Sequence, residues 1–203
     1  MKPTRALPDS HTRNWGIDLS RDHTSALLLN VAGLPLFLVC GWAFMSVAKV
    51  LRPEIMTGLL RGWLSIHPLT FVLVLAGIVV GVMTFHEAIH GIFFWIFTRS
   101  KPIFGVKLLF AYAGAPDWYI PRNQYILIGL APILLMTLLG FLLIVVTSTH
   151  VGQAVLFGIV MNATGAAGDL YVCGKVMAHD PDILVQDTGV GVTVFGRVPS
   201  PAL

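Results

Sequence analysis

The sequence predicts an α-helical integral membrane protein with about four transmembrane helices. Of its 203 residues, 56% are hydrophobic and only 11% are charged, whereas soluble domains carry about 25% charged residues. Its mean hydropathy is +0.80. A bilayer crossing needs roughly 20 apolar residues, and four stretches are long enough. They cover about residues 26–48, 69–97, 124–147 and 153–176.

Outside these spans, the sequence predicts a polar lead-in and two short β-hairpins. Residues 1–25 form a cytosolic N-terminal segment, and residues 26–182 are taken as one membrane domain. Residues 101–121 of that domain predict a β-hairpin at the membrane surface, with a turn at Gly114-Ala115-Pro116-Asp117. The Val- and Thr-rich tail, residues 183–203, predicts a second hairpin outside the membrane. The first hairpin rests on the alternation of Val106, Leu108, Phe110 and Tyr112 with Lys107, Leu109 and Ala111.

Prolines and cysteines within the spans are interpreted as structural. Pro35 and Pro132 are read as tolerated kinks, because transmembrane helices accommodate proline. Cys40 and Cys173 both fall in apolar segments. Two such residues indicate neither a disulfide framework nor a thiolate metal site, and they are read as small hydrophobic side chains.

The lysines and arginines indicate the orientation in the membrane. Ten of the 13 lie in the N-terminal segment, the loop between the second and third spans, and the C-terminal part of the chain. The other three are Lys49, Arg52 and Arg61, in the first loop. Because cytoplasmic loops are enriched in basic residues, both termini and the first hairpin are expected in the cytoplasm. Because the basic residues are spread over several separate loops and do not form one cluster, nucleic acid is not expected as a partner.

The second span contains a His-Glu-x-x-His sequence made by His86, Glu87 and His90. Helical residues i and i+4 lie on one face, so the two imidazoles can point at a single divalent metal ion. Glu87 is rotated by about 100° from His86 and could reach a water bound to that metal. Ionisable side chains are costly in hydrocarbon, and their presence at this depth therefore indicates a function.

Asp169 is the candidate for a third metal ligand. It and Glu87 are the only two of the ten acidic residues that fall inside predicted spans. His90 and Asp169 each lie roughly 10 Å from the cytosolic end of their span, so they can meet at one depth. The small residues of the Gly165–Gly168 stretch are expected to let the two helices approach closely. Two histidines and one carboxylate leave a fourth position for water, as in catalytic zinc sites, with Glu87 as the base.

Other interpretations of these residues stay open. Asn162, two turns before Asp169, could hold substrate or the metal-bound water, or could simply join two helices by a hydrogen bond. The cluster could bind or transport a metal without hydrolysing anything, or belong to an inactive protease-like scaffold. Haem ligation is disfavoured because His86 and His90 share one helix face. An aspartyl protease is disfavoured because Asp169 has no second intramembrane Asp.

The pattern resembles the site-2-protease group of intramembrane zinc metalloproteases, and is most similar to the zincin peptidases of the DUF3267 family. The resemblance rests on His86-Glu87-x-x-His90 together with Asn162-x-x-Gly165-x-x-Gly168-Asp169. It implies that His86, His90 and Asp169 bind zinc, that Glu87 is the catalytic base and that Asn162 assists. It also implies a hairpin whose edge strand receives an extended substrate. The sequence departs from the better-known Asn-x-x-Pro and Leu-Asp-Gly motifs, which leaves the carboxylate in place but changes the substrate-handling helix.

The sequence therefore predicts an intramembrane zinc metalloendopeptidase. It is expected in the cytoplasmic membrane as a multi-pass protein, with the bilayer and a membrane-embedded or juxtamembrane protein or peptide as its partners. Cleavage is expected near the cytosolic face, where the predicted depth places His86, His90 and Asp169.

Overall fold

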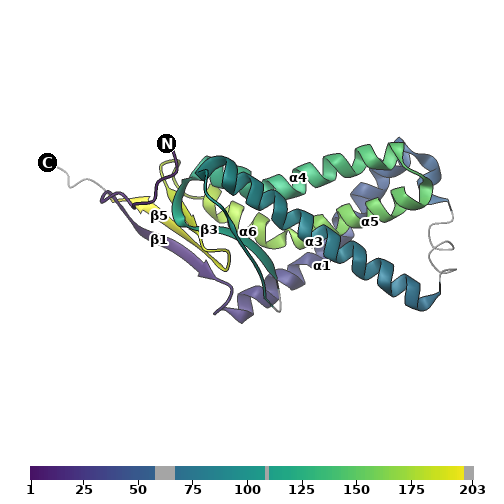
Figure 1. Ribbon diagram of the computed structural model, residues 1–203, viewed down its shortest axis with the longest axis horizontal. Helices are drawn as coiled ribbons and strands as arrows, with labels where there is room; N and C mark the ends of the chain where they lie inside the picture. Colours follow the sequence, from purple (N-terminus) through teal and green to yellow (C-terminus); the bar gives the residue numbers. More distant parts are fainter. Residues whose placement is uncertain (58–66, 108–109, 199–203) are drawn as a thin grey trace. The chain divides into compact units, whose positions relative to one another are not determined.

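The computed structural model describes residues 1–57, 67–107 and 110–198. The chain contains both helices and strands, and the strands come from its N-terminal, middle and C-terminal parts (Figure 1). The helices are α1 (His23–Leu51), the short 3₁₀ helix η1 (Pro53–Met56), α3 (Pro68–Thr98), α4 (Arg122–Val146), α5 (Thr149–Gly165) and α6 (Ala167–Met177). The strands are β1 (His11–Asp18), β2 (Ile103–Val106), β3 (Ala111–Pro121), β4 (Leu184–Asp187) and β5 (Gly191–Arg197).

Among the described residues, α1, α3 and α4 are long and apolar enough to cross a membrane. The predicted fourth span is not one straight helix. It consists of α5 and α6, which bend by 44° at a short break and together pass the same test. The break follows from weak helix formers, because Gly165 and Gly168 flank it and glycine costs about 1 kcal/mol in a helix. The Ala166 amide bonds back to the Asn162 carbonyl and closes α5.

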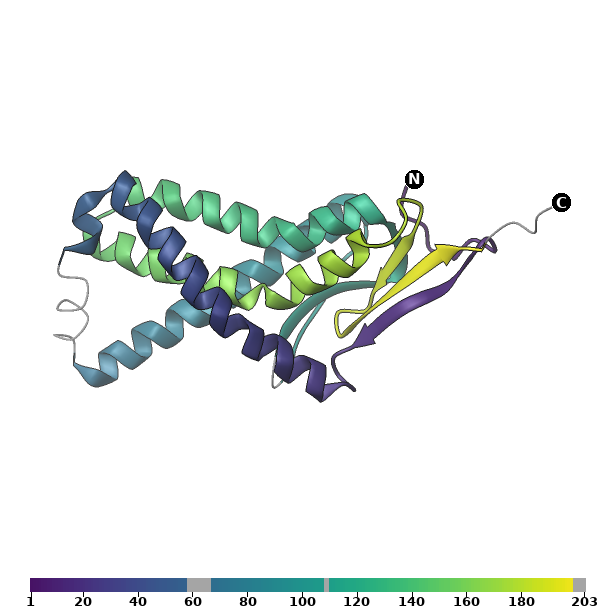
Figure 2. The same cartoon turned by 180° about the vertical axis from the view of Figure 1, so that it is seen from behind.

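The strand prediction was wrong in its layout. Both predicted hairpins form, as β2–β3 and β4–β5, but β3 pairs with β4 and joins them into one sheet. The N-terminal segment, expected to be a polar lead-in, supplies β1, which pairs antiparallel with β5. The result is a five-stranded antiparallel sheet with the order β1-β5-β4-β3-β2. In Figure 2 the purple β1 lies beside the yellow β5.

The turn of the first hairpin was also misplaced. The Gly114–Asp117 stretch lies within β3, where the pairing with β4 shifts register between Ala115 and Tyr119. Gly114 suits this place because a Cβ there would stand 2.5 Å from the backbone nitrogen of Gly189. The chain reverses instead between Val106 and Ala111. The expected strand residues Leu108 and Leu109, like Arg61 and the last residues of the tail, 199–203, lie outside the described residues.

The chain divides into two compact units. One comprises residues 1–30, 87–131 and 168–203, and the other residues 31–86 and 132–167. In the first, the sheet packs against the adjoining parts of α3, α4 and α6. Alternate residues of β5 are buried, as expected for a strand with one covered face. Its buried core includes Phe94, Ile120, Ile128, Val176, Val185 and Val194.

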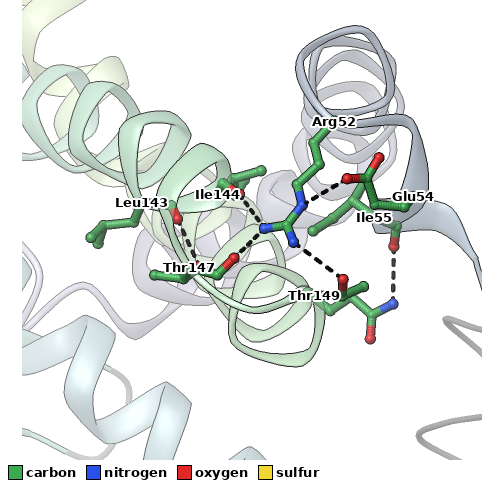
Figure 3. A network of polar contacts seen from close by, with 8 residues as sticks. Arg52, Glu54, Ile55, Leu143, Ile144, Thr147 and Thr149 are labelled. Carbon is green, nitrogen blue, oxygen red and sulfur yellow. Dashed lines mark hydrogen bonds and ion pairs between the residues drawn. The ribbon is translucent and has the colours of Figure 1, made fainter.

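The second unit contains a small core and a polar junction. Ala48, Ile55, Ile144, Leu156 and Ile159 make the core, which the end of α1, η1, α4 and α5 share. At the junction, the Arg52 guanidinium donates to the carbonyls of Ile144 and Thr147 and to the Thr149 hydroxyl (Figure 3). These carbonyls end α4 and have no partner within the helix. Arg52, which the sequence suggested only as a topology signal, therefore joins the ends of three helices.

Candidate metal centre

Three side chains that the sequence singled out come together on α3 and α6. His86 and His90 lie one turn apart on the uninterrupted α3, and Asp169 lies in the first turn of α6. One ligand atom from each residue lies within 4.8 Å of the other two. The His90 Nε2 and Asp169 Oδ1 atoms are 3.5 Å apart. The helical spacing and the matched depth thus predicted which residues meet.

This donor set fits a zinc ion. Two atoms that each lie about 2.1 Å from a tetrahedral metal are about 3.4 Å apart. The His90–Asp169 separation of 3.5 Å matches this value, and the three ligand atoms lie within 4.8 Å of one another. Imidazole nitrogen and carboxylate oxygen are ligands that zinc accepts, and three of them leave one position for water. His86 and His90 are only 8% and 7% exposed, whereas the Asp169 side chain keeps 27% of its surface accessible. The group is therefore shielded on its histidine side and accessible beside the carboxylate.

Both histidines are oriented through their Nδ1 atoms. His90 Nδ1 lies 3.0 Å from the Ile128 carbonyl of α4, and His86 Nδ1 lies 2.9 Å from Asn162 Oδ1 of α5. Carbonyl oxygens only accept hydrogen bonds, so each Nδ1 carries the proton in these contacts. With Nδ1 engaged as the donor, Nε2 is the nitrogen that each ring would offer to a metal, as in metal-binding histidines whose second nitrogen is hydrogen-bonded.

Asn162 is nearly inaccessible, with 1% of its surface exposed. Its Nδ2 donates to the Pro132 carbonyl over 3.3 Å while Oδ1 accepts from His86. Both contacts together fix which end of the amide faces His86, because the Pro132 carbonyl can pair only with a donor. In this structure Asn162 holds a histidine in place.

Glu87 follows His86 directly and is partly buried on α3. It occupies the position that a general base takes in a His-Glu-x-x-His helix, next to two metal-binding histidines. Its side chain thus belongs to the same turn of α3 as the two histidines.

The expected close packing at Gly165 and Gly168 is not found. A Cβ built on either glycine would meet no other described residue within 4 Å, although Ala166 and Ala167 between them are buried. The close approach of α6 is to α4, where the Cys173 sulfur occupies the place that a Gly129 side chain would need. The helix α6 therefore contacts α4 through Cys173 and Gly129, and the glycines Gly165 and Gly168 do not form the contact surface.

A further buried acidic residue, Asp187, was not singled out by the sequence. It lies at the end of β4, is 8% exposed, and accepts hydrogen bonds from the Tyr125 hydroxyl and the Gly189 amide, each at 2.7 Å. Burial raises the pKa of Asp187 to about 6, against the lowering effect of these two donors. In the sequence, Asp187 stands in an Asp-Thr-Gly stretch of the predicted C-terminal hairpin, which is typical of a turn. A turn pattern does not predict whether its aspartate is buried. Asp187 contacts Tyr125 of α4, a residue distant in sequence.

Comparison with known proteins identifies the family. The model of the DUF3267 family, described as putative zincin peptidase, matches residues 78–184. The chain belongs to the DUF3267 family. The matched region contains every member of the group described above, from His86 on α3 to Asp169 on α6. Zincins are zinc-dependent peptidases, so membership supports a metallopeptidase and zinc as its cofactor. No curated protein and no solved structure matches the chain.

Proposed function

We propose that this DUF3267 protein is an intramembrane zinc metalloendopeptidase. The observation that carries the proposal is the convergence of His86, His90 and Asp169, with Glu87 on the same helix turn as the histidines. Each histidine is held through Nδ1, and one ligand atom of each lies within 4.8 Å of an Asp169 oxygen. This is the arrangement that peptide hydrolysis by a His-Glu-x-x-His helix requires.

The proposed chemistry assigns one role to each residue. His86, His90 and Asp169 would hold zinc, which supplies Lewis acidity that lowers the pKa of a water molecule and polarises the scissile carbonyl. Glu87 takes a proton from the attacking water and delivers it to the leaving amine nitrogen. Asn162 keeps the His86 ring in its binding orientation. The accessible edge at Asp169 gives water and substrate a way to the centre.

The membrane location is supported by the outer surfaces of the long helices. Large apolar side chains on α1, α3 and α4 are widely exposed, and Trp42, Val80 and Leu138 are 72%, 63% and 61% accessible. Exposed apolar surface on this scale is unfavourable in water and is expected where a helix faces lipid. We place the protein in the cytoplasmic membrane, with both termini and the sheet on the cytoplasmic side, because the basic residues concentrate there.

An extended peptide that adds to β2 is the substrate form best supported. β2 ends the strand order of the sheet, so one of its edges has no neighbouring strand among the described residues. Phe104 of β2 packs where a Gly91 side chain would stand, directly after His90. A peptide paired with β2 would therefore run close to the metal centre. A helical substrate would first have to unwind, because helical carbonyls are already hydrogen-bonded.

The test is Glu87→Gln, with zinc content and cleavage measured on the same purified sample. We expect zinc to be retained at one ion per chain and cleavage of a membrane-anchored peptide to be lost. Glu54→Gln is the matched control, since Glu54 is the other glutamate of the chain and its side chain is 61% exposed. Normal cleavage by Glu87→Gln would refute the proposal. Zinc binding without cleavage by the wild type would favour a metal-binding protein or an inactive scaffold.

A further inference from the structure

Pro132 lies in α4 and is fully buried, where proline is unusual. Proline has no backbone N–H, so it cannot donate to the carbonyl four residues earlier. In α4 that carbonyl belongs to Ile128. A buried carbonyl without a partner is unfavourable, and the sequence must provide another donor.

The replacement donor is His90. Its Nδ1 lies 3.0 Å from the Ile128 oxygen, and both residues are buried. A regular helix at this position would offer an amide proton to the same oxygen and would compete with the imidazole. The missing amide of Pro132 therefore leaves Ile128 as an acceptor for a ring that faces the metal centre.

The carbonyl of Pro132 itself reaches the other histidine. It accepts from Asn162 Nδ2 over 3.3 Å, and this contact turns Asn162 Oδ1 toward His86 Nδ1 at 2.9 Å. A proline kink tilts nearby carbonyls away from the helix axis, which makes such side-chain contacts easier. Pro132 thus affects the hydrogen bonds of both histidines: its missing amide leaves the Ile128 carbonyl to His90, and its own carbonyl orients the Asn162 amide toward His86.

We propose that Pro132 is a positioning residue, which sets His86 and His90 as Nδ1–H tautomers so that both Nε2 atoms face the metal position. This inference rests on the proposed function only in taking His86 and His90 as metal ligands. It replaces the interpretation of Pro132 as a tolerated kink. Pro35 in α1 keeps that interpretation and provides a matched control, being the other proline inside a long helix of the described chain.

The experiment compares Pro132→Ala with Pro35→Ala in the full-length protein in detergent micelles. Nitrogen-15 NMR of the histidine side chains, on metal-free protein at a pH where the rings are neutral, reports the tautomers. Zinc affinity is measured by competition with a chelator. We expect Pro132→Ala to shift His90 toward the Nε2–H tautomer and to weaken zinc binding about 10- to 100-fold, the usual effect of losing such a support. Pro35→Ala should change neither quantity.

Two further readouts separate positioning from loss of structure. Alanine is a better helix former than proline, so the metal-free Pro132→Ala protein should unfold at the same or a higher temperature. Asn162→Leu should shift the tautomer of His86 and leave that of His90 unchanged. Unchanged tautomers and unchanged zinc affinity in Pro132→Ala would overturn the inference. A wild type that shows the expected tautomers and binds zinc, but cleaves nothing, would refute the peptidase proposal alone.

Discussion

Replacing Asp187 by asparagine should remove a pH dependence of stability that the buried carboxyl imposes. Asp187 is 8% exposed at the end of β4, and burial raises its pKa to about 6 from an ordinary value of 3.8. The folded protein therefore keeps a proton on Asp187 between these two values, whereas the unfolded chain has lost it. Stability from this group is complete below pH 3.8 and falls as the pH rises through 6.

The magnitude follows from the size of the shift. A difference of one pKa unit corresponds to about 1.4 kcal/mol, so a shift from 3.8 to about 6 corresponds to roughly 3 kcal/mol. The Asp187→Asn substitution also replaces one of the two acceptor oxygens by an amino group, but the cost of that lost hydrogen bond does not vary with pH. The free energy of unfolding of Asp187→Asn, relative to wild type, should therefore rise by roughly 2–3 kcal/mol between pH 4 and pH 7, since the unfolded chain has already lost part of this proton at pH 4.

The assay is denaturant unfolding in micelles at a series of pH values. Both proteins are treated with a chelator, so that release of zinc does not contribute to the pH profile. Parallel profiles for wild type and Asp187→Asn from pH 4 to pH 7 would refute the reasoning, because they would show that the carboxyl titrates as it does in the unfolded chain.

Three other substitutions test individual contacts of the fold by the same unfolding assay. Tyr125→Phe removes a donor that lowers the pKa of Asp187, so the loss of stability above pH 6 should become larger in the same unfolding series. Arg52→Met should lower the free energy of unfolding by about 2–3 kcal/mol, because it removes charged hydrogen bonds to the end of α4. Gly140→Ala should cost about 1–3 kcal/mol in the same assay, since its methyl group would collide with the Ile159 side chain.

The Arg52 and Gly140 substitutions each have a control within the chain. Glu54→Gln removes only the exposed ion-pair partner of Arg52 and should change stability by less than about 1 kcal/mol. Gly77→Ala places a methyl group in open space on α3 and should stabilise the helix by about 0.5–1 kcal/mol. Equal effects of Gly77→Ala and Gly140→Ala would contradict the packing argument, and a neutral Arg52→Met would contradict the capping role of Arg52.

The parts of the site that the sequence predicted depend on local spacing. His86 and His90 are four residues apart on one helix, so their convergence needs no tertiary information. Asp169 was found because a lone acidic residue in an apolar stretch is a strong signal, and a depth count placed it level with His90. The family assignment, made from the same residues, was confirmed.

The parts that were missed depend on contacts between distant segments. β1 pairs with β5 across most of the chain, and nothing local to the N-terminal segment indicates that partner. The partner of His90 is the backbone carbonyl of Ile128. Every residue has such a carbonyl, so the residue type at position 128 does not indicate the contact. The visible signal was Pro132, four residues later, whose missing amide marks which carbonyl becomes available. A proline in a membrane helix can thus indicate where a buried donor is needed.

The most direct test of the metal centre is zinc K-edge X-ray absorption on the purified full-length protein. The account predicts one zinc per chain, four-coordinate, with two imidazole nitrogens and two oxygens at about 2.0–2.1 Å. The imidazole signal should disappear together with the zinc when His86 and His90 are both replaced by alanine. A sulfur ligand at about 2.3 Å, or a zinc signal unchanged by the double substitution, would contradict the assignment of His86, His90 and Asp169 as the metal ligands.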